Sequence, residues 1–236
     1  MKKTLIATAT YNEAKNIKIF LKRTINLKMK LDILIIDDNS PDGTSEEIEK
    51  IKKKNNNIYL IKRTKKKGLD TAHKIIYKYA LKNKYHYLIT MDADLSHNAK
   101  TIPKFLKEIK NYDCVIGSRY IKGGRNDLKG IRLVLSKYGN LFIKFILGIN
   151  LSEFTTSYRC FNMQRLKKFN LNKVKAKGYS FFMYTIYLLN KLGYSIKEIP
   201  IIFYERNSGK SKIPKIELLR TLINIFIIKF NFLKIN

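Results

Sequence analysis

The sequence predicts an α/β protein built on a doubly wound, mostly parallel sheet with helices on both faces. Short apolar runs typical of buried strands alternate with longer segments in which apolar residues recur at helical spacing. Polar, turn-forming residues follow these runs, most densely at residues 37–43. A chain of 236 residues, 45% of them hydrophobic, is long enough for one sizeable domain with a modest extension.

Apolar runs predict the strands of the first half of the chain. They are residues 5–8, 31–36, 58–61, 87–91 and 114–117. The second run is apolar except for Asp32, which is typical of a central parallel strand. Helical patterns lie between the runs, and Thr44 and Glu47 predict a capping box at the start of the second helix. Pro103 suits the first turn of the fourth helix.

The second half predicts helices more than strands. Residues 131–149, 181–192 and 214–233 show apolar residues at helical spacing, and residues 196–204 resemble a further strand. The last helix keeps a wide apolar face but contains several charged residues. We therefore expect it to lie in a membrane interface rather than to span the bilayer. Docking of this helix on the protein's own core is the alternative.

The formal net charge of +30 predicts an anionic partner: a nucleic acid, an anionic membrane surface or a phosphate-bearing ligand. Lysine, asparagine and isoleucine are all abundant, as drift towards A/T-rich codons would produce, so we interpret much of the lysine excess as solvated surface. Arginine in such a chain is expected where a planar fork must bind phosphate or carboxylate. The arginines to follow on this ground are Arg119, Arg132, Arg159 and Arg206.

Two carboxylates one residue apart, Asp92 and Asp94, follow the strand predicted at residues 87–91. Open α/β sheets bind their ligands at the carboxyl ends of the strands, and paired carboxylates suit a hard divalent cation. From these residues alone, a metal site and a capped polar turn are equally consistent with the pattern. The choice between them depends on the surrounding motifs.

An ordered series of motifs resembles family 2 glycosyltransferases of the GT-A fold, and within them the dolichol- or polyprenol-phosphate mannose synthase group. The matching segments are residues 10–13, 35–44, 68–69, 71–72, 91–97, 117–120, 132 with 136, 155–159, 177–179 and 206–212. The resemblance implies a Rossmann-like GT-A domain at residues 1–212, followed by an amphipathic interface helix at residues 213–236. Within the domain, residues 1–117 would bind the nucleotide-sugar and metal, and residues 118–212 the acceptor.

The resemblance implies an inverting, metal-dependent transfer of a hexose, most directly mannose from GDP-mannose, to a polyprenyl or dolichyl phosphate, giving a β-linked product. A transferase that uses UDP-glucose or another UDP-sugar is one alternative, and an enzyme that acts on a cell-surface polysaccharide is another. The latter is disfavoured because Tyr184 stands where many relatives carry a carboxylate that would deprotonate a sugar hydroxyl. A nucleic-acid-binding protein would explain the charge but not the acids at two strand ends, so no nucleic-acid partner is expected.

On the donor side, the resemblance places Asp92 and Asp94 at a Mg²⁺ or Mn²⁺ ion bound to the diphosphate, with Ser96 at most a weak or water-mediated ligand. Glu13 and Asp38 would hold the base and ribose. The donor-binding residues implied in this way are Ala9, Tyr11, Glu13, Asp38, Asp92, Arg206 and Lys212.

On the acceptor side, a polyprenyl monophosphate is largely dianionic near neutral pH because its second pKa is about 6, so it needs no general base. It needs an electropositive pocket that holds one phosphate oxygen in line with the departing diphosphate. The acceptor-binding residues implied by the resemblance are Arg119, Arg132, Ser136 and Arg206. Catalytic contributions are expected from Asp92, Asp94, Arg119 and Arg132.

The implied partners are a nucleotide-sugar donor, polyprenyl phosphate and an anionic membrane surface. The sequence leaves open whether a separate membrane subunit or a homo-oligomer joins them. Peripheral attachment at the cytoplasmic face is expected, because no stretch of about 18 uncharged apolar residues is present. The N-terminal apolar run is too short for a signal peptide.

Overall fold

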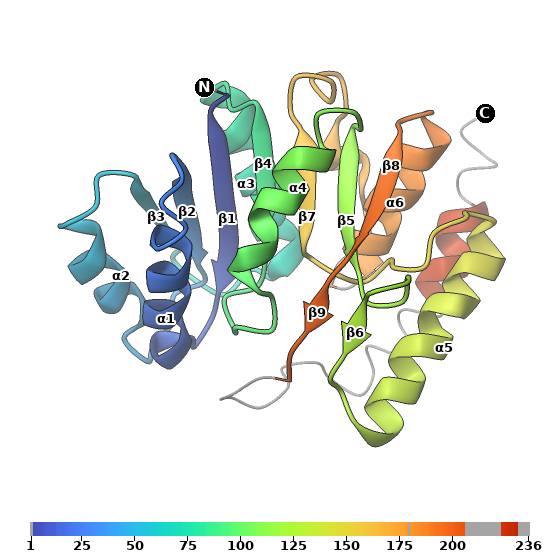
Figure 1. Cartoon of the computed structure of the whole chain (residues 1–236), viewed down its shortest axis with the longest axis horizontal. Coiled ribbons are helices and arrows are strands. Elements are labelled where there is room, and N and C mark those ends of the chain that lie inside the picture. The colour runs from blue at the N-terminus through green and yellow to red at the C-terminus, as the bar shows by residue number, and fades with distance from the viewer. Residues whose placement is uncertain (1, 179, 206–222, 231–236) are drawn as a thin grey trace.

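A computed structural model describes residues 2–178, 180–205 and 223–230, and a seven-stranded sheet forms its centre (Figure 1). The strand order is β3-β2-β1-β4-β7-β5-β8. The strands are β1 (Thr4–Thr10), β2 (Asp32–Asp37), β3 (Ile58–Lys62), β4 (Tyr87–Thr90), β5 (Cys114–Ser118), β7 (Arg159–Asn162) and β8 (Ile196–Pro200). Only β7 runs antiparallel to its neighbours. The predicted mostly parallel α/β sheet is confirmed.

Helices cover both faces of this sheet (Figure 1). One face carries α1 (Ala14–Ile25), α2 (Thr44–Lys52) and α4 (Ile102–Glu108). The other carries α3 (Leu69–Lys82), α6 (Ser180–Lys191) and the inner side of α5 (Gly130–Leu147). Short 3-10 turns lie at Ala99–Thr101 and Leu171–Lys173.

Alternation of side chains along the strands divides the core into two layers. In β2, Ile33 and Ile35 pack with α1 and α2, whereas Leu34 and Ile36 pack with α3 and α6. All four side chains are at most 1% exposed. The uninterrupted apolar run of this strand is thus explained by its burial on both faces, as the sequence predicted.

The antiparallel strand β7 was missed from the sequence because its residues, Arg-Cys-Phe-Asn, contain no apolar run. It lies between β4 and β5, and Cys160 pairs with Ile89 on one side and Val115 on the other. Its insertion brings the segment before it, residues 153–158, beside the ends of β4 and β5. Those residues prove central to the candidate site.

The single strand expected at residues 196–204 is wrong, since two strands occupy this segment. β8 belongs to the main sheet, while β9 (Ile202–Phe203) pairs with β6 (Arg125–Asn126) in a separate two-stranded sheet. Pro200, which has no N–H to donate, is the last residue of β8. The chain then crosses from the main sheet towards the loop that follows β4, where Phe203 forms a bridge with His97.

The capping box expected at Thr44 and Glu47 is also wrong. Gly43, with a φ of 85°, precedes α2, and Thr44 is already helical. The Thr44 hydroxyl donates to Asp42 Oδ1 (2.5 Å) and accepts the backbone N–H of Glu13 (2.9 Å). Thr44 therefore joins the start of α2 to the loop after β1.

The interface helix expected near the C-terminus falls within the described residues only at positions 223–230, which are helical (red in Figure 1). Ile225 and Ile228 are buried against the core, and Asn224 Nδ2 donates to Ser180 Oγ (3.0 Å). Within the described part of the chain, no helix combines the length and apolar character needed to cross a bilayer. The helix expected at residues 131–149 ends at Leu147, followed by left-handed Gly148 (φ 65°).

Candidate active site

The residues expected to bind substrates follow strands that run in the same direction, so they gather at one edge of the sheet (Figure 1). Glu13 follows β1, Asp38 follows β2, the Asp-Ala-Asp motif follows β4 and Arg119 follows β5. This is the edge at which open α/β sheets bind their ligands. The strand ends therefore bring Glu13, Asp38, the Asp-Ala-Asp motif and Arg119 to one edge of the sheet.

The adjacent acids after β2 have different partners. Asp37 is fully buried and accepts hydrogen bonds from the hydroxyls of Thr10 (2.8 Å), Ser40 (2.6 Å) and Ser45 (2.8 Å). These bonds join β1, β2 and α2, so the role of Asp37 is to hold the turn. Asp38 extends to the other side, where its carboxylate pairs with the guanidinium of Arg63.

The pair between Asp38 and Arg63 is buried, with both residues at most 6% exposed. The backbone N–H groups of Lys67 and Gly68 also donate to Asp38 Oδ2, at 3.3 and 3.2 Å. Arg63 in turn donates to the carbonyl of Gly68 (3.1 Å). Asp38 therefore organises the loop between β3 and α3, which the sequence analysis did not connect to it.

Of the residues expected around the base, Tyr11 lies at the same loop. Lys66 Nζ is 4.0 Å from the centre of the Tyr11 ring, a cation–π contact that brings the β3–α3 loop over Tyr11. Glu13 accepts a hydrogen bond from Asn16 Nδ2 (2.7 Å) at the start of α1. Ala9 lies within β1 and is partly buried. The predicted donor residues of the first two strands thus border one another.

In the Asp-Ala-Asp motif, a serine hydroxyl contacts each carboxylate. Ser157 Oγ donates to Asp92 Oδ1 (2.6 Å), and Ser96 Oγ donates to Asp94 Oδ1 (2.6 Å). The backbone N–H of Ser96 reaches the same Asp94 oxygen at 3.1 Å. Leu95, between them, adopts a left-handed φ of 68° that closes this tight turn.

These contacts suit the two aspartates as metal ligands better than they suit Ser96. Asp92 keeps a side chain 34% exposed, and hydroxyl donors orient a carboxylate without neutralising its charge. Ser96 is fully buried and donates to Asp94, so it supports that carboxylate and is not placed to bind a metal ion itself. Among the described residues no three acidic, histidine or cysteine side chains form a group that could hold a metal ion by themselves. Two carboxylates fit an ion such as Mg²⁺, whose remaining ligands come from substrate phosphate and water.

His97, the last residue of the motif at residues 91–97, is a buried structural part of it. It is 3% exposed, stacks on Tyr158 at 4.8 Å between ring centres and contacts Phe203 edge-on at 5.5 Å. Its Nδ1 accepts the backbone N–H of Asp92 (3.1 Å), which leaves the proton on Nε2, 3.5 Å from Thr156 Oγ1. Burial lowers the pKa of His97 below its ordinary value, against the opposing charges of Asp92 and Asp94.

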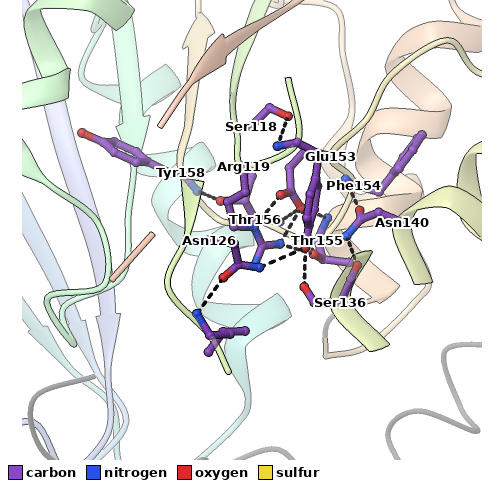
Figure 2. Close-up of polar contacts among 12 residues, drawn as sticks. Ser118, Arg119, Asn126, Ser136, Asn140, Glu153, Phe154, Thr155, Thr156 and Tyr158 are labelled. Atoms are coloured by element: carbon purple, nitrogen blue, oxygen red, sulfur yellow. Dashed lines mark hydrogen bonds and ion pairs between the residues drawn. The ribbon is translucent and has the colours of Figure 1, made fainter. Parts of the chain in front are cut away.

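Arg119 forms a buried, two-bonded pair with Glu153 (Figure 2). Its Nε and one terminal nitrogen donate to the two oxygens of Glu153 at 2.7 and 2.8 Å, and Thr155 Oγ1 accepts another bond at 2.9 Å. Burial alone would raise the pKa of Glu153, but the charge and hydrogen bonds of Arg119 hold that pKa below its ordinary value. The arginine expected to bind acceptor phosphate is therefore engaged by a carboxylate of its own protein.

Arg132 and Ser136 lie one turn apart on α5, at the side of the site (Figure 2 shows Ser136). Arg132 is half-exposed and pairs with Glu205 at 3.6 Å. Ser136 Oγ lies 2.6 Å from the hydroxyl of Tyr120, the residue after Arg119. These contacts place the two predicted acceptor residues on a helix connected to the Arg119 loop. The expected clamp residues Arg206 and Lys212 lie outside the described residues.

Arg159, followed as a candidate for binding phosphate or carboxylate, has another role. It is 1% exposed and donates to the backbone carbonyls of Phe154 (2.8 Å) and Phe182 (2.8 Å). Burial lowers the pKa of Arg159 to about 10, so it remains a cation at neutral pH. Arg159 pairs with Thr90 at the end of β4, and its guanidinium joins α6 to the segment that carries Glu153.

Comparison with known proteins agrees with this geometry. The model of the glycosyl transferase family 2 matches residues 5–169, more than half of the chain. The chain belongs to glycosyl transferase family 2. An undecaprenyl-phosphate mannosyltransferase from Micrococcus luteus is 33% identical over 211 residues, which cover 89% of this chain and 87% of the relative. A polyprenol monophosphomannose synthase from Mycolicibacterium smegmatis is 34% identical over 213 residues, covering 89% of this chain and 80% of the relative.

Solved structures share the fold of this family 2 glycosyltransferase. A glucosyl-3-phosphoglycerate synthase from Mycobacterium tuberculosis, in complex with UDP, superposes with a TM-score of 0.69 at 11% identity over 97% of this chain and 80% of that one. The mannosyltransferase PcManGT from Pyrobaculum calidifontis, in complex with GDP-Man and Mn²⁺, gives 0.57 at 17% identity over 89% of this chain. This chain spans 58% of that longer protein. The expected GT-A-like fold is confirmed.

Proposed function

We propose that this protein transfers mannose from GDP-mannose to a polyprenyl phosphate, with inversion and with a bound Mg²⁺ or Mn²⁺. The observation that carries the proposal is the Asp-Ala-Asp motif at the end of β4, with its carboxylates oriented by Ser157 and Ser96. The two relatives named for polyprenol-phosphate mannosyl transfer cover 89% of the chain and support the choice of sugar and acceptor.

The donor would lie across the ends of β1, β2 and β4. Tyr11 with the loop at Lys66 offers an apolar and cationic edge for the base, and Asp38 supplies a fixed acceptor for its N–H groups or for a ribose hydroxyl. Asp92 and Asp94 would hold a divalent cation, which would supply positive charge to the diphosphate as the sugar–phosphate bond breaks. Arg206 and Lys212 remain part of the proposal, as phosphate-binding cations, on their sequence motif alone.

The acceptor phosphate would approach from the side of α5. Arg132, whose side chain is 52% exposed, is available to an incoming anion in exchange for its half-exposed partner Glu205. Arg119 is fixed by its pair with Glu153 and holds the backbone of the next residue, Tyr120, in place. The Tyr120 hydroxyl in turn positions Ser136. A dianionic phosphate oxygen held in line attacks the anomeric carbon directly, which inverts an α-linked donor to a β-linked product.

The polysaccharide alternative needs a carboxylate that can deprotonate a sugar hydroxyl. At the position where relatives carry it, Tyr184 lies in α6, 8% exposed in the apolar core. We therefore propose a phosphate acceptor, with the donor bound by residues 1–117 and the acceptor by residues 118–212. The reaction would take place at the cytoplasmic face of a membrane, with or without a membrane subunit or a second copy of the chain.

The test is incubation of the full chain with polyprenyl phosphate, Mg²⁺ or Mn²⁺, and a panel of labelled GDP- and UDP-sugars. We expect metal-dependent transfer from GDP-mannose, with a β-anomeric lipid product identified by NMR. Replacement of Arg132 by glutamine should raise the KM for the lipid several-fold and leave the KM for the donor unchanged. Transfer from a UDP-sugar alone would support the alternative donor, and transfer only to a saccharide would overturn the proposal.

A further inference from the structure

Helix α5 presents a stripe of exposed apolar side chains along its whole length. The stripe consists of Ile131, Val134, Leu135, Tyr138, Leu141, Phe142 and Phe145. Phe145 is 81% exposed and Ile131 68% exposed, values more typical of surface lysines than of large apolar residues. Between these two residues the stripe is about 21 Å long at the helical rise of about 1.5 Å per residue.

The stripe lies on the side of α5 opposite the core. At 3.6 residues per turn its members fall within about 60° of the direction of Tyr138. The residues that α5 buries, Asn140, Ile143 and Leu147, fall on the opposite side. A surface helix of a soluble protein buries its apolar side, whereas α5 has apolar residues on both, so its outer face lacks a covering layer among the described residues.

Helix 223–230 extends this surface. Its buried residues anchor it to the core, while Ile223, Phe226, Ile227 and Phe230 remain between 44% and 57% exposed. Phe226 contacts Phe142 of α5, with ring centres 6.4 Å apart, so the two exposed faces are continuous. Figure 1 shows the two helices side by side at one end of the molecule. We call the exposed apolar residues of both helices the docking face.

Cationic residues flank the docking face. On α5, Arg132 lies to one side of the stripe, and Lys137 and Lys144 to the other, when the helix is drawn at about 100° per residue. The sequence of α5 contains no acidic residue. Apolar residues bordered on both sides by cations are the pattern of a helix that lies in the surface of an anionic bilayer.

We propose that the docking face inserts into the interfacial region of an anionic lipid bilayer and holds the enzyme with α5 parallel to the membrane surface. The charge pattern favours this occupant over a second copy of the chain, because a symmetric contact would bring the same lysines and arginines of both copies together. The sequence analysis expected an interface helix only near the C-terminus. The docking face also includes α5, which contributes more of its exposed apolar residues than helix 223–230 does.

This placement has a consequence for catalysis, which rests on the proposed function. Arg132 flanks the stripe, and Ser136, the other proposed acceptor residue, lies one turn further along α5 on the side that faces Tyr120. A bilayer that receives the stripe would therefore present lipid phosphates at the level of Arg132. The polyprenyl chain could remain in the membrane while its phosphate reaches the ends of β4 and β5.

The experiment compares the wild-type chain with a stripe variant, Ile131→Ser, Tyr138→Ser and Phe145→Ser together, in flotation with phosphatidylcholine vesicles that contain phosphatidylglycerol. The matched control changes exposed apolar residues elsewhere, Ile19→Ser, Met29→Ser and Leu192→Ser. We expect the partition coefficient of the stripe variant to be lower than that of wild type by a factor of at least about ten, because three large apolar side chains no longer enter the bilayer. The control should partition like wild type.

The cations are tested by Lys137→Gln with Lys144→Gln, against Lys104→Gln with Lys107→Gln on α4. The double variant on α5 should bind the anionic vesicles several-fold more weakly than wild type. Any binding to pure phosphatidylcholine should be unchanged, because only the anionic surface attracts the two charges that are removed. An equal loss from both pairs would show a non-specific effect of net charge and would contradict the role of the flanking residues.

Sedimentation and a soluble acceptor separate the remaining outcomes. A stripe variant that floats like wild type overturns the inference, as does a wild-type dimer that the stripe variant converts to a monomer while neither binds vesicles. Transfer to a short-chain, water-soluble polyprenyl phosphate should be retained by the stripe variant, because its site is intact. Vesicle binding that requires the stripe, in a protein that transfers no sugar to any polyprenyl phosphate, would contradict the proposed function and leave the docking face standing.

Discussion

The two paired-acid turns of this protein, after β2 and after β4, look alike in sequence but differ in electrostatics. After β2, the second carboxylate, Asp38, is matched by the buried guanidinium of Arg63. After β4, Asp92 and Asp94 are held by the hydroxyls of Ser157 and Ser96. Asp38 therefore has a buried arginine as its counter-charge, whereas Asp92 is oriented by a hydroxyl and keeps a side chain that is 34% exposed.

This difference explains why one turn is suited to a neutral ligand and the other to a cation. A carboxylate paired with arginine can still accept a hydrogen bond from a base or ribose. The positive charge of the arginine offsets the negative potential that would attract a metal ion. Asp92, oriented by the Ser157 hydroxyl, stays 34% exposed at the edge of the sheet and is accessible to a cation. The pair formed by Arg119 and Glu153 repeats the first arrangement on the acceptor side.

The largest effect that the comparison predicts is on activity, at the second turn. Asp94→Asn keeps the shape of the side chain but removes the charge, so metal-dependent turnover should fall roughly 100- to 1,000-fold with little change in unfolding. Initial rates across a Mn²⁺ titration, together with denaturant unfolding, measure both. The matched change Asp37→Asn should instead lower stability, because Asp37 is the buried acceptor of three hydroxyls. Near-normal turnover of Asp94→Asn would contradict the metal assignment.

At the first turn the largest effect should be on stability. Arg63→Met removes the counter-charge of Asp38 and should destabilise the protein by about 3–5 kcal/mol, the usual cost of leaving one buried charge without its partner. Urea unfolding measures it. The double variant with Asp38→Asn should recover part of the loss, because no buried charge then remains. A strictly additive double variant would show that the two side chains act independently.

The pair of Arg119 and Glu153 should make the free energy of unfolding depend on pH in the acidic range. The pKa of Glu153 is lower in the folded protein than its ordinary value of 4.5. Its contribution is therefore complete above that unfolded value and is lost as the pH falls through the lower folded pKa. Urea unfolding from pH 7 to pH 3 should show a smaller acid-dependent loss in Glu153→Gln, which is less stable at pH 7, than in wild type. Parallel curves for the two proteins would contradict this role.

A smaller effect is expected at His97, which supports the second turn from behind. His97→Phe keeps the ring stacking but cannot accept the Asp92 N–H, so the affinity for Mn²⁺ should fall about tenfold or somewhat more. Mn²⁺ binding followed by electron paramagnetic resonance, in the presence of the nucleotide-sugar, measures this directly. His97→Asn offers an acceptor again and should restore part of the affinity. Unchanged Mn²⁺ binding in His97→Phe would reduce His97 to a packing residue.

Much of the first half of the chain, residues 1–117, was predictable because its signals are local. Apolar runs and turn residues identified β1 to β5, and the positions of Asp38, Asp92 and Asp94 at strand ends follow from those runs. Ser96 was expected near the metal, and its proximity to Asp94 in sequence made that expectation reasonable. What no local pattern revealed is that its hydroxyl points into the protein and donates to Asp94.

The second half, from residue 118, was less predictable, because its contacts join distant segments. Glu153 is 34 residues from Arg119, and Ser157 is 65 residues from Asp92. Both depend on β7, a strand whose composition gives no strand signal. An arginine in a lysine-rich chain was a useful sign of a guanidinium that makes specific hydrogen bonds. The sign could not say that the partner of Arg119 would be Glu153 and that of Arg159 two backbone carbonyls.

By itself, the sequence determined the alternation of strands and helices, the paired acids at strand ends and the cationic surplus, because each follows from neighbouring residues and elementary periodicity. Only the tertiary structure decided the partners of Asp38 and Asp92. The charge of Asp38 is balanced because β3 places Arg63 beside it, while Asp92 meets a hydroxyl because β7 inserts antiparallel between β4 and β5. The field at a carboxylate depends on groups within a few ångströms in space, and the fold alone sets which groups those are.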